Sequence, residues 1–282
     1  MKIKPGFISV FLIGLIAGIL RVAQYILAID EEGYYLKGGL PRFLEGFLVG
    51  LLLVGLAWAV FCGIARKSVQ VGFSSLGLEA LYPRILFALL GLTAAAQGIL
   101  CLTGSVKPTS VLVGLFCLLG AIGWFLPARL GRATGLTALL PLLHLGAAVI
   151  AYFWDTYKYI HISEYALGLL GLCVLLFFAL NLMKIVAGGE VPQHRLARAG
   201  FYTLLFSFAS FLAPAAGMML HGWKAETLLL CLTGLLYILL AVYTLRRLPA
   251  AVVFPRAEGP DVSEMNDYIS DIPEIKENDE ND

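Results

Sequence analysis

FISVFLIGLIAGILRVAQYILAI, residues 7–29, is a long apolar run that contains a single charged residue, Arg21. A helix needs about 20 mostly apolar residues to cross a bilayer, and this run meets that requirement. Seven similar runs follow, so we predict eight transmembrane helices. Their expected bounds are 7–29, 43–64, 84–104, 109–127, 134–156, 164–187, 199–220 and 225–245. Because backbone groups in lipid must bond within their own segment, the predicted fold class is an all-α integral membrane bundle.

The composition supports a lipid environment. Hydrophobic residues make up 60% of the 282-residue chain and charged residues 14%, and the mean hydropathy is +0.86. A soluble domain has about 45–50% apolar and about 25% charged residues. The surplus apolar surface is therefore expected to face lipid. The length leaves room for one transmembrane domain, which we place at residues 1–248.

Residues 249–282 differ in character from the rest of the chain. Positions 258–282 hold ten acidic residues and one base, Lys276, and prolines interrupt the segment. Such a segment cannot bury enough apolar surface to fold alone, so we predict a disordered acidic tail. The stretch VSEMNDYISDIPEI, 262–275, places apolar side chains among the acids. It is either a solvated tail or a docking segment for a protein partner.

Lysine and arginine are unevenly distributed between the two sets of loops. The segments on one side of the predicted membrane hold fourteen of them and those on the other side hold five. Cytoplasmic loops of multi-pass proteins carry the excess of positive charge. Both termini are therefore predicted to be cytoplasmic.

A polar site in the outer half of the membrane is predicted from Arg21, Gln24, Glu45 and Asp155. Arg21 lies fourteen residues after Phe7, about 21 Å along the helix, which is the outer third of the bilayer. Gln24 is three residues further on and shares its face. Glu45 and Asp155 lie near the outer ends of their spans, so either is a candidate ion-pair partner for Arg21. The arginine either extends outward to the membrane surface, forms a structural ion pair, or lines an outward cavity with Gln24 and a carboxylate.

Two glycine pairs suggest how the first two helices pack. Gly14 and Gly18 lie in the first span, and Gly46 and Gly50 in the second, each pair with a spacing that permits close helix approach. We therefore expect these helices to pack tightly. That packing would bring the arginine of the first span near the glutamate of the second.

The connections add two expectations. The inner segment 65–83 mixes apolar and small polar residues, and we expect it to lie in the membrane interface as a short amphipathic helix. Residues 84–129 and 198–247 follow one plan, in which a base, a span, a short outer loop and a second span lead to another base. A four-plus-four duplication is one explanation of this likeness. The similar composition of all apolar helices is the other.

Other polar residues within the spans have modest expected roles. His144 lies mid-span, three residues after Pro141, and is either a proton relay or a hydrogen-bonding partner of a neighbouring helix. Gln97 and Asn181 are expected to bond between helices. The five cysteines all lie in apolar runs and are expected to behave as small hydrophobic side chains.

Several classes of function have no motif in this chain. It lacks the glycine-rich lysine loop of ATPases, the HExxH of zinc proteases and the GxSxG of serine hydrolases. We therefore expect no enzyme, no cofactor and no metal site. The basic residues lie at the predicted membrane edges, so no nucleic-acid partner is expected. The expected partners are the lipid bilayer and a protein that binds the tail 258–282.

LRVAQYILAIDEEGYY, residues 20–35, resembles a segment of uncharacterised multi-pass membrane proteins from clostridia-like Gram-positive bacteria. In those proteins a first helix bearing Arg and Gln runs into an Ile-Asp and a Gly-aromatic turn. The resemblance implies a bacterial inner membrane and carries no activity. The predicted function is a transport-type or solute-sensing protein with the polar outer-half site. The alternative is a non-catalytic membrane scaffold that acts through its acidic tail.

Overall fold

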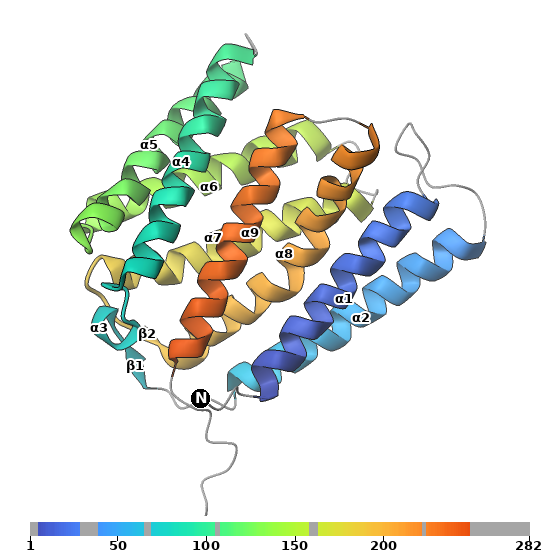
Figure 1. Cartoon of the computed structure of the whole chain (residues 1–282), viewed down its shortest axis with the longest axis horizontal. Helices are drawn as coiled ribbons and strands as arrows, with labels where there is room; N and C mark the ends of the chain where they lie inside the picture. The colour runs from blue at the N-terminus through green and yellow to red at the C-terminus, as the bar shows by residue number, and fades with distance from the viewer. Residues whose placement is uncertain are drawn as a thin grey trace, which may run out of the picture. The chain divides into compact units, whose positions relative to one another are not determined.

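The computed structural model of the chain describes residues 5–28, 39–64, 69–104, 108–157, 163–221 and 224–248. Within these ranges the chain is all-α, with eight helices long and apolar enough to cross a membrane (Figure 1). They are α1 (Pro5–Ala28), α2 (Gly39–Ile64), α4 (Leu81–Gly104), α5 (Pro108–Leu130), α6 (Gly135–Thr156), α7 (Ser163–Val186), α8 (Gln193–His221) and α9 (Ala225–Arg247). The acidic tail and the first outer loop lie outside the described residues.

The eight predicted spans are confirmed as helices, and the differences lie at their ends. The helix α8 begins at Gln193, whereas the apolar run predicts a start at residue 199. The first turns of α8 carry His194, Arg195 and Arg198, and a prediction based on apolar residues leaves these turns out. The helical backbone continues past the apolar boundary because polar side chains are compatible with a helix that emerges from lipid.

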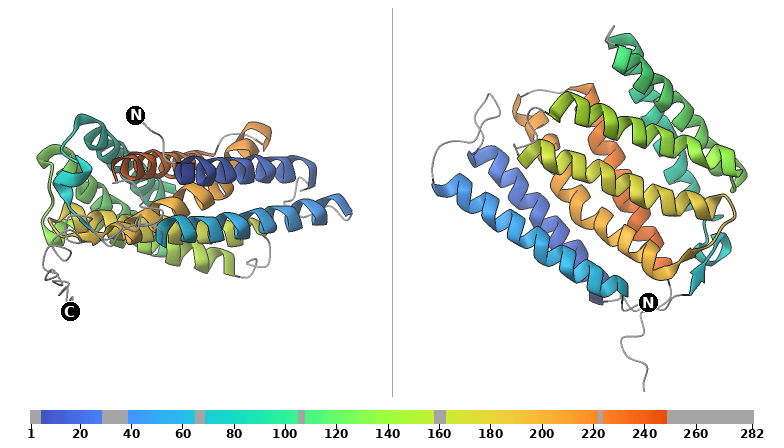
Figure 2. Two further views of the ribbon diagram at one scale, coloured as in Figure 1. Left: turned by 90° about the horizontal axis from the view of Figure 1, so that it is seen from below. Right: turned by 180° about the vertical axis from the view of Figure 1, so that it is seen from behind.

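Six of the long helices form a closed ring. Each packs against the next along the chain from α4 to α9, and α9 packs back against α4. The helices α4 and α9 lie on one side of the ring and α6 and α7 on the other (Figure 2). The hairpin of α1 and α2 lies outside the ring, with both of its helices against α8. The inner end of the bundle is defined as the end at which α1 begins and α9 terminates.

Aromatic side chains fill the inner half of the ring. Trp124 of α5 stacks on Phe87 of α4, with ring centroids 5.7 Å apart, and meets Tyr237 of α9 edge-on at 6.0 Å. Phe178 of α7 meets Tyr237 in the same way at 6.4 Å. All four side chains are buried. Because they come from four helices, they join opposite sides of the ring and close it to solvent at this level.

The segment after α2 corrects the expectation of an amphipathic helix at the interface. The described part of it forms strand β1 (Gln70–Val71) and the four-residue helix α3 (Phe73–Leu76). The strand pairs antiparallel with β2 (Val191–Pro192), which follows α7. Val71, Phe73, Leu76 and Leu78 are buried. The apolar side chains that suggested a membrane surface are instead covered by the inner ends of the helices.

The expected duplication receives no support from the packing. The ring takes α4 and α5 from the first half of the chain and all four long helices, α6 to α9, from the second half. The hairpin α1–α2 and its counterpart α6–α7 therefore have different surroundings. The strands β1 and β2 do follow equivalent helices, α2 and α7.

The glycine pairs do not act as predicted. A Cβ atom on Gly14 would lie 2.6 Å from the carbonyl oxygen of Leu204, and one on Gly18 would lie 3.0 Å from that of Phe208. Both contacts are with α8, so the first pair fits α1 against α8 and not against α2. No atom of the described residues lies within 4 Å of a Cβ placed on Gly46 or on its partner four residues later. The helices α1 and α2 still pack together, but through other positions.

This contrast predicts different costs for the same substitution. Gly14→Val forces α1 away from the α8 backbone and should lower the free energy of unfolding by about 1–3 kcal/mol, the usual cost of overpacking. Gly46→Val is the matched control, because its side chain meets open space. Thermal unfolding of both variants in detergent checks the prediction. Equal melting temperatures would contradict the close contact between α1 and α8.

Candidate functional site

Two of the four predicted site residues lie together at the outer end of α1. Arg21 and Gln24 are 1% and 0% exposed, and the Arg21 Nη1 atom donates a hydrogen bond to Gln24 Oε1. They are three residues apart, one turn along the helix. Gly18, one turn earlier, contacts α8. The guanidinium is therefore buried within the bundle and does not extend outward into solvent.

Of the other two predicted residues, the structure describes the side chain of Glu45 and not that of Asp155. Among the described residues the one ion pair within 4 Å is Arg132–Glu79, at the inner end, so no such contact links Arg21 with Glu45. Asp155 belongs to α6, which packs against α5 and α7, whereas α1 packs against α2 and α8. The side chain of Asp155 lies outside the described residues. The site formed by all four residues therefore stays a prediction, because the structure describes the side chains of only three of them.

A cavity of about 230 Å³ lies instead inside the ring of α4 to α9. Five of the six ring helices contribute to its wall, and α8 alone contributes none of its described lining residues. The polar and sulfur-bearing lining residues are Gln97, Cys101, Cys117, His144, Tyr152 and Glu226. The rest of the lining is aliphatic. Such a wall, mostly apolar with a few converging polar groups, is the usual composition of a small-molecule site.

The cavity occupies the outer half of the bundle. Cys101 lies three residues before the end of α4, and Glu226 is the second residue of α9. His144 lies twelve residues before the end of α6, about 18 Å from that end of the helix. The cavity therefore extends from the outer helix ends toward the middle of the bundle. The aromatic side chains of the inner half lie below it.

Glycine and proline determine the position of His144. A Cβ atom on Gly120 of α5 would lie 2.5 Å from the Cβ of His144, and one on Gly123 would lie 2.4 Å from the Cδ of Pro141. Only glycine at these positions lets α5 come so close to α6. Pro141 has no backbone N–H, so it frees the carbonyl of Thr137 one turn earlier. The backbone next to the cavity is therefore the weakest part of α6.

Two of the polar groups have incomplete hydrogen bonding. The Nδ1 atom of His144 is buried and meets no hydrogen-bonding partner among the described residues. Gln97 donates from Nε2 to the Oγ1 atom of Thr233 over 3.5 Å, which is at the limit of a hydrogen bond. Thr233 in turn donates to the carbonyl of Leu229 at 2.8 Å. The Nδ1 atom faces α5, 3.1 Å from where a Cβ on Gly120 would lie, whereas the Gln97 amide keeps bonding capacity beside the cavity.

Sequence reasoning missed this site because it depends on which helix faces meet. His144, expected to relay protons or to bond to a neighbouring helix, and Gln97, expected to bond between helices, stand out as polar residues within spans. The contact of Gln97 with Thr233 of α9 confirms the expectation for Gln97, whereas Asn181, expected to do the same, bonds within α7. Cys101 and Cys117 were expected to be small hydrophobic side chains, and Glu226 was not singled out. The one signal of the site in the sequence was that His144 and Gln97 are polar residues well inside their apolar spans. Nothing in the sequence indicated that α4, α5, α6 and α9 close a ring around them.

Comparisons of this chain with protein-family models, curated proteins and solved structures give no match. Across the described residues no group of three or more His, Cys, Asp or Glu side chains is arranged to hold a metal ion. The chemistry of the cavity must therefore be argued from its own residues. It offers hydrogen bonds from neutral groups at its base and a carboxylate at its outer rim.

Cysteine labelling provides a test of access to the cavity. Cys101 lines the cavity, whereas Cys173 of α7 is exposed on the side of a membrane-spanning helix. We expect a charged methanethiosulfonate reagent outside the cell to label a variant that retains only Cys101. A variant that retains only Cys173 should react at least about tenfold more slowly, because thiolates form and react in water and not in lipid. Equal rates would contradict a cavity that opens outward.

Proposed function

We propose that this protein binds a small polar solute in the cavity of the α4–α9 ring, as a transporter or a solute sensor of a bacterial inner membrane. With both termini in the cytoplasm, the site opens to the outside. The observation that supports the proposal most strongly is the gathering of polar side chains from α4, α6 and α9 around one cavity within the spans. Ionisable groups at this depth are costly in lipid and are usually retained for a function.

The incomplete bonding favours a ligand over a purely structural role. Buried polar groups that only join helices have their hydrogen bonds satisfied within the protein. Leaving such a group without a partner costs about 1–3 kcal/mol. The Nδ1 atom of His144 has no partner among the described residues, and Gln97 has a long bond. A solute that bonds to the Gln97 amide would replace its long bond and recover part of that cost.

The size and charge of the cavity restrict the solute. Its volume of about 230 Å³ is below the about 300–1,000 Å³ of pockets that hold drug-sized ligands. The described lining includes Glu226 at the rim and no lysine or arginine. A small neutral or cationic solute with hydrogen-bonding groups fits this wall. An anion would meet the Glu226 carboxylate at the entrance, and no described lining residue carries a positive charge to offset it.

A route through the membrane would require movement at the inner half of the ring. The ring is closed there by Trp124 and the aromatic side chains it contacts. Pro141 gives α6 a flexible point one turn from His144. In a transporter, bending of α6 at this point would couple occupation of the cavity to separation of the aromatic side chains. In a sensor, the same bending would alter the inner loops without opening a path.

Thermal stability against a panel of small solutes tests the proposal. A solute that binds only the folded protein raises the melting temperature. At a concentration of 100 times its Kd it adds about 2.7 kcal/mol to the free energy of unfolding. We expect Gln97→Leu and His144→Leu to abolish the shift, because each removes a bonding group from the cavity wall. Arg21→Leu should leave the shift in place, because Arg21 is not among the lining residues.

Asn181→Leu is the matched control. Asn181 is a buried amide of α7 that bonds to the carbonyl of Phe177, outside the cavity. Its loss should lower the basal melting temperature without changing the solute-induced shift. A shift that survives in Gln97→Leu and His144→Leu but disappears in Arg21→Leu would move the site to α1. Two results together would favour the scaffold alternative. No solute would shift the melting temperature, and deletion of residues 258–282 would remove a bound protein.

A further inference from the structure

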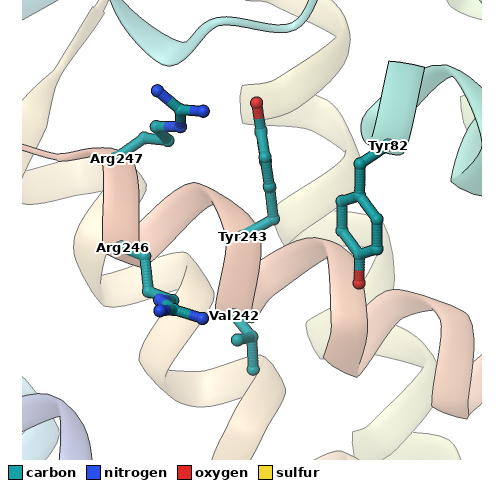
Figure 3. Close-up of a pocket in the computed structure, with 5 residues that line it drawn as sticks. All are labelled: Tyr82, Val242, Tyr243, Arg246 and Arg247. Carbon is teal, nitrogen blue, oxygen red and sulfur yellow. The ribbon is translucent and has the colours of Figure 1, made fainter. Parts of the chain in front are cut away.

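A second concave site lies at the inner end of α9, outside the ring. It is a hollow of about 590 Å³ lined by Tyr82, Val242, Tyr243, Arg246 and Arg247 (Figure 3). Two guanidinium groups and two phenol rings thus share one surface. The described lining includes no carboxylate. The cavity that we assign to a solute lies at the opposite end of the same helix, so the two sites are separate.

The wall of this hollow is held in place by the inner loops. Tyr243 donates a hydrogen bond from its hydroxyl to the carbonyl of Gly77 at 2.7 Å. Its ring lies 5.5 Å from that of Tyr82, and the Arg247 guanidinium lies 5.5 Å from its centroid. Gly77 has a φ of 61°, in the left-handed region that favours glycine. The turn after α3 therefore fixes Tyr243, and Tyr243 positions Arg247.

The hollow continues into the lipid-facing surface of α9. Leu232 and Leu235 are 38% and 48% exposed, and Leu239 and Val242 follow on the same face of the helix. Arg246 is the next residue of this stripe, one turn after Val242. From Leu235 to Arg246 the helix rises about 16 Å. That is close to the thickness of one leaflet, about half of the 30 Å hydrocarbon core.

We propose that this hollow binds the phosphate of an anionic phospholipid from the inner leaflet. Guanidinium groups pair with phosphate oxygens in a bidentate manner, and basic pockets at the cytoplasmic ends of transmembrane helices hold lipid headgroups. Arg246, which points toward Val242 at the end of the leucine stripe, binds the phosphate, and Arg247, which points to the other end of the hollow beside Tyr243, adds positive charge (Figure 3). The Tyr82 hydroxyl lies at the interface where it reaches the headgroup. The acyl chain lies along the leucine stripe of α9. The excess of inner lysine and arginine places the site in the same leaflet.

The apolar stripe distinguishes a lipid from other anions. Free phosphate would use only the arginines and would leave Val242 and the leucines without a ligand. The acidic tail 258–282 starts soon after α9 and carries ten carboxylates, so it too has the charge to bind Arg246 and Arg247. Its acids cannot enter the hydrocarbon layer next to Leu235. Only a lipid has an anionic group and an apolar chain at the required separation.

Thermal unfolding of the full-length protein in detergent, with added lipid, tests this proposal. Phosphatidylglycerol should raise the melting temperature, whereas phosphatidylcholine and inorganic phosphate at equal concentration should have little effect. Arg246→Gln should weaken the apparent affinity for phosphatidylglycerol by about tenfold, which is the loss of one charge-assisted bond, and Arg247→Gln should weaken it by a smaller factor. Two variants are used so that poor folding of one does not leave the question open.

Arg129→Gln is the matched control, because Arg129 is exposed at the inner end of α5 and is not a lining residue. Its affinity for phosphatidylglycerol should equal that of the unmodified protein. If Arg129→Gln lost as much affinity for phosphatidylglycerol, the lipid would be attracted by the overall positive charge of the inner end, and the proposal of a specific site would be overturned. Inorganic phosphate that matches phosphatidylglycerol would show a site for a soluble anion. A large gain in lipid affinity after deletion of 258–282 would identify the tail as the occupant.

Discussion

The cost of an unsatisfied polar group inside a lipid-surrounded bundle is the constraint on which the rest of this structure depends. It forces the chain into helices, since only helices satisfy their backbone within one segment. It also explains the buried Arg21–Gln24 contact, in which a guanidinium is held by an amide one turn away. The cavity of the ring is one place where this cost is not avoided, and the buried Ser207 and Tyr237 hydroxyls, which also lack a described partner, are others. His144 and Gln97 keep bonding capacity where the surrounding structure would be expected to remove it.

Close helix approach is what makes the cavity. Gly120 and Gly123 bring α5 against His144 and Pro141 of α6, and the aromatic contacts of Trp124 close the ring below. The hairpin α1–α2 packs onto α8 from outside, through Gly14, and leaves the ring intact. The loops at the inner end add β1, β2 and α3, which join distant parts of the chain. The result is a bundle closed at its inner end, with its polar cavity in the outer half.

Much of the fold could be predicted from the sequence, because the length and apolarity of each span are local properties. The same reasoning failed where contacts between helices decide the outcome. Gly46 has the same spacing signal as Gly14, yet it faces open space, because a one-dimensional pattern does not say which helix lies opposite. Arg21 was correctly singled out as unusual, but it bonds to Gln24 and is buried away from the cavity. Glu226 lies at the start of a helix, where acidic residues are common. Its place at the rim of the cavity becomes apparent only from the arrangement of the ring helices.

A map by electron cryo-microscopy of the protein in lipid nanodiscs, with the best-stabilising solute added, tests the central claim most directly. The account predicts density that is not protein within bonding distance of Gln97 and His144, inside an open outer half of the ring. A dry ring, in which a neighbouring helix supplies the partner of the His144 Nδ1 atom and no space remains beside Gln97, would contradict it. The polar residues would then be structural, and the function would have to lie elsewhere in the chain.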